Sequence, residues 1–69
     1  MTKLEVTAIA INKDTVECNS EFNGQVFNKV LLANRNVEVG SYYKITLKDC
    51  DLVNMTMVAN VESITKLNS

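Results

Sequence analysis

The sequence predicts a small all-β domain in which five short antiparallel strands close into a barrel. Apolar and polar residues alternate along most of the chain, which is the period of strands with one buried face. Turn-forming residues recur about every ten positions, as they do between the short strands of barrels. The 69 residues suffice for one domain, residues 1–69, without a covering helix. Closure into a barrel removes the exposed strand edges that invite aggregation.

The first two strands are expected at Lys3–Ile11 and Thr15–Phe22. The first has a polar face at its start and is apolar on both faces at its end, as a strand entering a barrel interior would be. The second has an acidic outer row, and its inward row contains Val16, Cys18 and Phe22. Asn12–Asp14 between them is expected as a turn, because Asn and Asp side chains bond locally to the backbone.

The third segment, Gln25–Ala33, fits both a strand and a helix. Asn23–Gly24 before it accepts the two positive φ values of a type I′ turn, which favours an antiparallel return strand. We therefore expect a strand whose inward row is Val26, Val30 and Leu32. The helical alternative places four residues on one stripe: Val26, Phe27, Val30 and Leu31.

The fourth segment, residues 37–49, reads VEVGSYYKITLKD. Gly40 allows a bend, and the residues after it alternate. The inward row is expected to be Tyr43, Ile45 and Leu47, and the outward row Tyr42, Lys44, Thr46 and Lys48. Asp49–Asn54 is expected as a loop.

The fifth strand is expected at Met55–Ser63, and a helix over Leu52–Val61 is the alternative. Its inward row would be Met55, Met57, Ala59 and Val61. In the tail after it, order is expected only at Ile64 and Leu67.

The stretch VEVGSYYKITLKD, followed by a loop and NMTMVANVES, resembles the second half of a small OB-fold module. TRAM domains and RNA-binding repeats of the ribosomal-protein type share this order of glycine turn, alternating strand, loop and last strand. The resemblance covers residues 37–63. The shorter pattern V-x-V-G-x-x-x-x-I is also similar to Sm and Tudor-like barrels. The resemblance implies an OB-like or Sm/Tudor-like barrel and, for the OB-like type, binding of RNA or single-stranded DNA.

Six residues are candidates for such nucleic-acid contacts. Tyr42, Lys44 and Lys48 form an outward stripe, in which a ring can stack on bases and lysines neutralise phosphates. Phe27 and Lys29 would join the stripe if they lie outward on the third strand, and Arg35 adds a cation in the following loop. The alternative is an ordinary solvated face. The net charge of −1, from seven basic and eight acidic residues, gives no general attraction to nucleic acid.

Apolar residues at nominally outward positions favour a second function. They are Ile9, Ile11, Phe27, Leu31 and Val58. Because a small barrel does not bury both faces of every strand, such residues favour a protein–protein interaction module. A phage-encoded or bacterial inhibitor, an adaptor, an assembly accessory or a homo-oligomer would fit. The alternative is that the strand ends curl inward and bury both faces.

The composition argues against an enzyme. The absence of histidine excludes a Ser/His/Asp or Cys/His triad and a zinc-ligand spacing, so neither a metal nor a cofactor is expected. Asp49 and Asp51 should raise the pKa of the Cys50 thiol and weaken it as a nucleophile. No secretory signal or membrane-spanning stretch is seen, and a cytoplasmic chain with free cysteines is expected.

Overall fold

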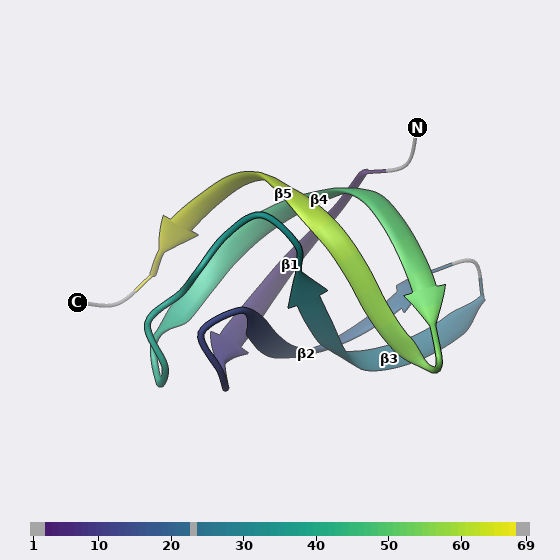
Figure 1. The fold of residues 1–69 in the computed structure, drawn as a ribbon, viewed down its shortest axis with the longest axis horizontal. Coiled ribbons are helices and arrows are strands. Elements are labelled where there is room, and N and C mark those ends of the chain that lie inside the picture. The colour runs from purple at the N-terminus through teal and green to yellow at the C-terminus, as the bar shows by residue number, and fades with distance from the viewer. Residues whose placement is uncertain (1–2, 23, 68–69) are drawn as a thin grey trace.

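Five strands follow one another around a closed barrel in the order β1-β2-β3-β5-β4, and β4 closes the ring by pairing with β1 (Figure 1). This computed structural model describes residues 3–22 and 24–67. The strand bounds are β1 Lys3–Ala10, β2 Thr15–Phe22, β3 Gln25–Leu32, β4 Tyr42–Val53 and β5 Thr56–Lys66. The predicted five-stranded all-β barrel is confirmed, and both helical alternatives are wrong. No helix in the described ranges is long and apolar enough to cross a membrane.

Four of the five strand pairings are antiparallel, and β3 pairs with β5 in parallel. An odd number of strands cannot alternate in direction around a closed ring, so one neighbouring pair has to be parallel. The seams differ in length. The β1–β4 ladder runs from Lys3 to Ile9, whereas β3 pairs with β5 over Val30–Leu32 and β1 with β2 over Ile9–Ala10. The barrel is therefore closed by two short seams.

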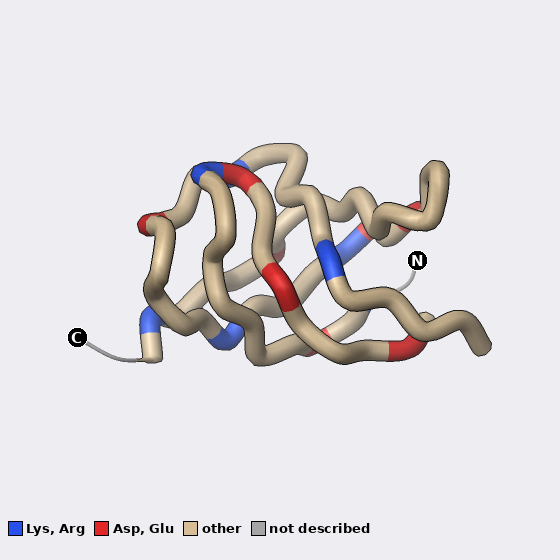
Figure 2. The backbone as a smooth tube through the Cα atoms, turned by 90° about the horizontal axis from the view of Figure 1, so that it is seen from below, with Lys and Arg blue, Asp and Glu red and all other residues tan. Residues whose placement is uncertain are grey.

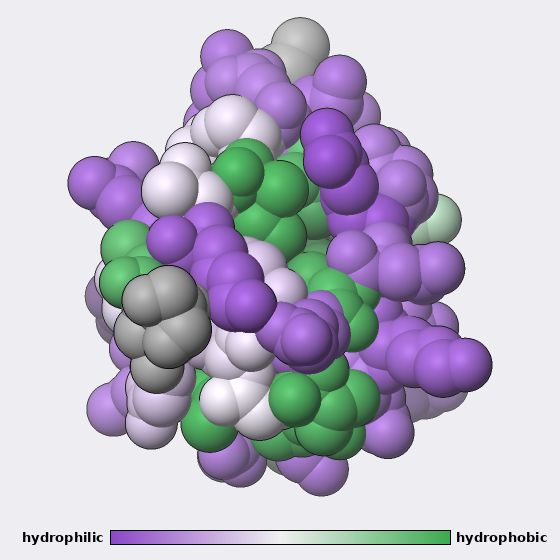
Figure 3. Space-filling model, turned by 90° about the vertical axis from the view of Figure 1, so that its left-hand side faces the viewer, coloured by the Kyte–Doolittle hydropathy of each residue, from purple (hydrophilic) through white to green (hydrophobic). Residues whose placement is uncertain are grey.

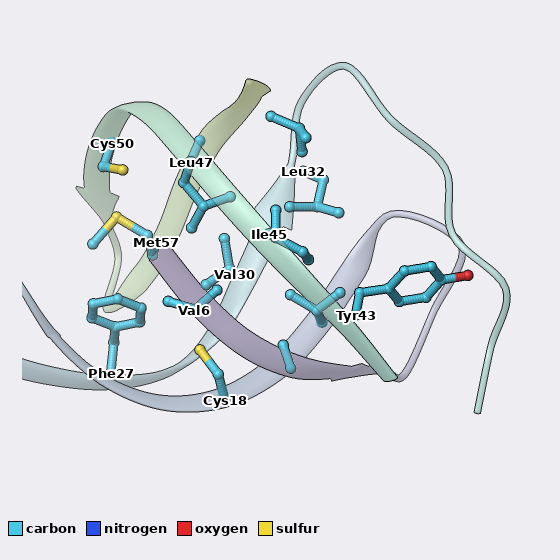
Figure 4. Close-up of a cluster of buried hydrophobic side chains, with 14 of the residues drawn as sticks. Val6, Cys18, Phe27, Val30, Leu32, Tyr43, Ile45, Leu47, Cys50 and Met57 are labelled. Atoms are coloured by element: carbon cyan, nitrogen blue, oxygen red, sulfur yellow. The ribbon is translucent and has the colours of Figure 1, made fainter. Parts of the chain in front are cut away.

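Inward side chains from all five strands form one core (Figure 4). Its largest fully buried members are Ile45, Leu47, Met57, Val16 and Val30. Tyr43 is buried at the rim, and its ring points towards the loop between β3 and β4 (Figure 4). Its hydroxyl oxygen accepts a hydrogen bond of 3.0 Å from the backbone N–H of Glu38. The predicted inward row of the fourth segment is thus confirmed.

The inward row of β3 differs from the predicted one. Phe27 is 4% exposed and lies in the core, whereas Val26 is 73% exposed. Asn28 and Lys29 both face solvent before Val30 turns inward again. The register between β2 and β3 shifts between Glu17 and Ser20, and such a bulge changes which residues face the core. The outward placement of Phe27 was wrong because it assumed unbroken alternation.

The β4–β5 hairpin also departs from the prediction. β4 continues to Val53 through a register shift at Asp49, whose φ is 53°, so the predicted loop at Asp49–Asn54 is mostly strand. Asn54 and Met55 form a two-residue turn with φ values of 50° and 64°. Met55 therefore points to solvent and not into the core. The Asn23–Gly24 turn is described at Gly24, with φ 81°, while Asn23 lies outside the described residues.

The loop of residues 33–41 covers one end of the barrel. The N–H of Val37 donates to the carbonyl of Lys13, and the N–H of Gly40 donates to that of Ala10. At the start of this loop, the Asn34 side chain binds the backbone of Val61 twice. Its Oδ1 accepts from the Val61 N–H at 2.8 Å, and its Nδ2 donates to the Val61 carbonyl at 3.3 Å. Asn34 thereby extends the β3–β5 seam beyond its last paired residues.

Candidate functional site

The stripe of Tyr42, Lys44 and Lys48 lies over β4, where Tyr42 and Lys44 are exposed and Lys48 is half-buried. The β1–β4 register places Thr7 beside Lys44 and Lys3 beside Lys48. At about 3.3 Å per residue, the stripe extends about 20 Å along the strand. These three side chains share one outward row, as their alternation in the sequence predicted.

Carboxylates offset the positive charge of this face. Three exposed ion pairs lie on it or at its border, with N–O distances of 3.8, 2.9 and 2.5 Å: Lys44–Glu5, Lys3–Glu62 and Lys66–Glu38. Hydrogen bonds from Lys66 and Ser41 lower the pKa of the Glu38 carboxyl. The hydrogen bond to Glu38 in turn raises the pKa of Lys66. Acidic and basic positions are interleaved along the strands (Figure 2). A phosphate backbone would meet a nearly neutral surface here.

The other three nucleic-acid candidates do not join the stripe. Phe27 is buried. Lys29 is exposed on β3, but β5 separates β3 from β4, so its side chain leaves the barrel in a different direction from Lys44. Its neighbour across the β2–β3 ladder is Glu17. Arg35 lines a polar hollow of about 230 Å³ together with Asp14, at the end covered by the loop of residues 33–41.

Four of the five apolar residues expected outward are half-buried: Ile9, Ile11, Leu31 and Val58. The fifth, Phe27, is fully in the core. The interpretation that curling strands cover both faces therefore accounts for much of this apolar surplus.

A different apolar surface lies where the β2–β3 and β4–β5 hairpins end, at the right of Figure 1. Val26, Leu52 and Met55 are exposed there, and Met55 is 91% exposed. With Gln25 they line an open groove of about 290 Å³. We call Gln25, Val26, Leu52 and Met55 the hairpin patch. None of its four side chains is charged.

The backbone beside the hairpin patch is also unpaired. β2 covers one edge of β3 along Gln25–Leu31, whereas β5 pairs with the other edge from Val30 onward. Among the described residues, no strand pairs with that second edge over Gln25–Lys29. Natural edge strands are usually protected by charges, prolines or bulges. Within this stretch, Lys29 is the one charged residue.

Met55 occupies its turn position at a conformational cost. The left-handed region disfavours residues with a Cβ by about 1–2 kcal/mol, and type I′ turns place Gly at this position for that reason. A strained, exposed methionine does not favour the stability of the isolated chain, and backbone outliers of this kind cluster at functional sites. The patch was not predicted from the sequence, because regular alternation places Val26 and Met55 in the core. Asn54–Met55 was the sequence feature that could have indicated the patch, because a two-residue hairpin turn at this place would expose Met55, where such turns usually have glycine.

The opposite end of the barrel carries the polar hollow lined by Asp14 and Arg35, in place of an apolar groove like that of the hairpin patch. Figure 3 looks onto that end, where the loop of residues 33–41 and the end of β5 lie. Apolar surface appears there in separate areas between hydrophilic side chains (Figure 3). Val39 in this loop is 59% exposed, and it lines neither the polar hollow nor the groove of the hairpin patch.

Cys18 and Cys50 are free and buried. Burial is the main cause that raises the pKa of both thiols, and Asp49 and Asp51 raise that of Cys50 further. The predicted direction for Cys50 is confirmed, although its carboxylate neighbours are the smaller cause. Neither thiol is suited to nucleophilic chemistry at neutral pH. Across residues 3–22 and 24–67, no group of metal-ligating side chains is placed to hold an ion.

No protein-family model, curated protein sequence or solved structure matches this chain. Functional inference therefore rests on the surfaces of the barrel itself.

Proposed function

We propose that this chain is a small non-enzymatic protein-binding module that receives its partner on the hairpin patch. The observation that carries the proposal is the solvent exposure of Val26 and Met55 beside a groove without charged lining. Clustered apolar side chains at a groove are typical of interaction sites, whereas single exposed ones are common everywhere. A cytoplasmic role as an inhibitor, adaptor or assembly accessory of a phage or bacterium fits this chemistry. The free cysteines support a reducing compartment.

The free edge of β3 supports a mode of binding for this patch. An extended segment added to an unpaired strand edge gains main-chain hydrogen bonds, and alternate side chains enter neighbouring pockets. Here the edge over Gln25–Lys29 would supply the hydrogen bonds, and Val26, Leu52 and Met55 the apolar contacts.

Selection of binders from a random-peptide display library tests the proposal. Peptides are selected on the immobilised wild-type chain and then measured against two variants. Val26→Lys places a charge in the groove, and Val39→Lys is the matched control on an exposed valine outside it. We expect peptides that contain an uncharged apolar stretch and whose affinity falls at least about tenfold with Val26→Lys and is unchanged with Val39→Lys. Failure to select any peptide that depends on Val26 would count against the proposal.

A second candidate function is binding of RNA or single-stranded DNA through Tyr42, Lys44 and Lys48. The observation in its favour is the strand order, since a five-stranded Greek-key barrel with β5 between β3 and β4 supports the OB-like over the Sm/Tudor-like type. This function predicts that a fluorescent oligonucleotide binds at low salt, and that Lys44→Ala reduces the salt dependence by about one phosphate contact. Absence of binding at low salt would exclude it.

A further inference from the structure

We infer that the hairpin patch takes an extended segment of a partner protein that is uncharged where it fills the groove and carries lysine or arginine residues on its flanks. This inference rests on the proposed function of the patch and names the chemistry of its partner. A protein segment suits the patch better than a nucleic acid, because the exposed residues that border the groove include carboxylates, which repel phosphates.

The unpaired edge of β3 sets the length of the segment. β3 starts at Gln25, but its pairing with β5 begins only at Val30, so the edge of Gln25–Lys29 runs past the β3–β5 seam. At about 3.3 Å per residue, this edge extends about 17 Å. An extended segment of about five residues would pair along it, with alternate side chains directed towards the groove.

The charges that border the groove are acidic. Glu21 on β2 lies opposite Val26, and Asp51 on β4 directly precedes Leu52. Both carboxylates are exposed. The groove itself has no charged lining, so a charged residue placed inside it would lose its hydration without gaining a counter-charge. The partner should therefore be uncharged inside the groove and positively charged beside it.

The two hairpin ends differ in charge from the other parts of the chain. Residues 18–28 and 49–58 contain three acidic residues and neither lysine nor arginine: Glu21, Asp49 and Asp51. The remaining residues carry a net charge of +2, although the whole chain has a net charge of −1. Lys29 follows on β3, but it lies opposite Glu17 on β2. A basic partner is thus attracted to this end of the barrel in particular.

The acidic residues at the hairpin ends have no cation of their own within residues 3–22 and 24–67. None of the three takes part in an ion pair there. Three carboxylates elsewhere on the barrel each contact a lysine at 3.8 Å or less: Glu5, Glu38 and Glu62. Basic residues on a partner would therefore supply counter-charges that the chain provides on its other faces but not here.

A basic side chain on the bound segment can reach Glu21 across Val26. Opposite residues of an antiparallel pair point to the same face, so these two side chains share the outward face of the β2–β3 ladder. Strands lie about 4.8 Å apart, which places a residue of the added segment about 10 Å from Glu21. The methylene stem of a lysine or arginine can lie on the exposed Val26 side chain while its charged end extends to the carboxylate.

Two peptide display libraries that differ only in their flanks test the inference. Both have a central stretch of about five positions randomised among uncharged residues, and lysines flank it in one library and glutamates in the other. We expect binders that depend on Val26 from the lysine-flanked library alone. Dependence on Val26 is measured with Val26→Ser, which removes the apolar contact without adding a charge. Replacing the flanking lysines of a selected peptide by glutamine should weaken its binding at least about tenfold.

Variants of the chain test the same contacts from the other side. Glu21→Gln and Asp51→Asn should each weaken binding of a selected peptide about threefold, because each removes one exposed charge pair. Glu5→Gln removes an equal charge from an exposed position on β1 and is the matched control, which should bind like the wild type. Fluorescence anisotropy with labelled peptide at low salt measures these affinities, and the differences should shrink at about 0.5 M salt.

Two outcomes would overturn the inference. One is selection of binders that depend on Val26 from the glutamate-flanked library as readily as from the lysine-flanked one, which would leave the proposed protein-binding function standing. The other is equal binding of lysine-flanked peptides to Glu21→Gln, Asp51→Asn and the wild type, since the charge contacts would then lie elsewhere. If neither library yields a binder that depends on Val26, the proposed function fails together with the inference. The two failures are therefore distinguishable.

Discussion

The short β3–β5 seam should depend on Asn34, and we expect Asn34→Ala to lower the free energy of unfolding by about 2 kcal/mol. The substitution removes both hydrogen bonds to Val61. Val61 is 4% exposed, so water does not readily replace the lost acceptor, and an unpaired buried N–H costs about 1–3 kcal/mol. A domain of this length has a total stability of about 3–10 kcal/mol. The loss should lower the melting temperature by about 10 °C.

Urea and thermal unfolding measure this effect, and Asn36→Ala is the matched control. Asn36 is exposed in the same loop and makes no side-chain hydrogen bond among the described residues. Amide hydrogen exchange adds a local test, because the Val61 N–H should lose protection in Asn34→Ala before the rest of β5 does. If Asn34→Ala and Asn36→Ala unfold at the same urea concentration, Asn34 does not hold the seam.

Three further effects can be measured in the same unfolding experiments. Met55→Gly should raise stability by about 1 kcal/mol, because glycine accepts the φ of 64° without strain; no gain would mean that the turn is not left-handed at this residue. Tyr43→Phe should cost about 1 kcal/mol, because the Glu38 N–H loses its acceptor, and an unchanged urea midpoint would contradict that bond. Burial raises the pKa of Cys18 and Cys50 above the ordinary value of 9.0, so the folded chain keeps thiol protons that the unfolded chain releases. Their contribution to stability is full below about pH 9 and is lost as the pH rises through the folded-state pKa values; replacing both cysteines by alanine should weaken this alkaline decline, and an equal decline would refute it.

Regular alternation made much of the fold predictable from sequence. β2 has its predicted bounds, and Tyr43, Ile45 and Leu47 on β4 face the core as expected. In these stretches every second residue meets the same interior, so local pattern and tertiary packing agree. The pattern failed at the bulge between Glu17 and Ser20 and at Asp49, whereas the register shift between Thr46 and Leu47 left the inward row of β4 unchanged. The position of a bulge depends on how two strands close around the barrel, and that information is not local.

The candidate surfaces also divide into those that local alternation predicts and those that depend on how the strands close into the barrel. Alternation alone was enough to predict the outward row of Tyr42, Lys44 and Lys48, and these residues lie on one face. Whether Lys29 joins this row depends on the order of the strands, and β5 lies between β3 and β4 and separates them. The hairpin patch needed both the strand order and the bulge, because it joins the ends of two hairpins and requires Val26 to face outward. A surface assembled from two hairpins was therefore beyond what one-dimensional periodicity can show.

Val26 and Phe27 provide the sharpest test of this bulged register. Unbroken alternation places Val26 in the core and Phe27 in solvent, whereas the structure reverses the two side chains. Phe27→Ala should therefore cost about 3 kcal/mol or more, because it removes a ring packed in the core. Val26→Ala should change stability by less than about 0.5 kcal/mol at dilute protein concentration, because an exposed side chain loses few contacts. Urea unfolding of both variants decides between the two registers. A large cost for Val26→Ala together with a small cost for Phe27→Ala would refute the bulge, and with it the outward-facing Val26 on which the hairpin patch depends.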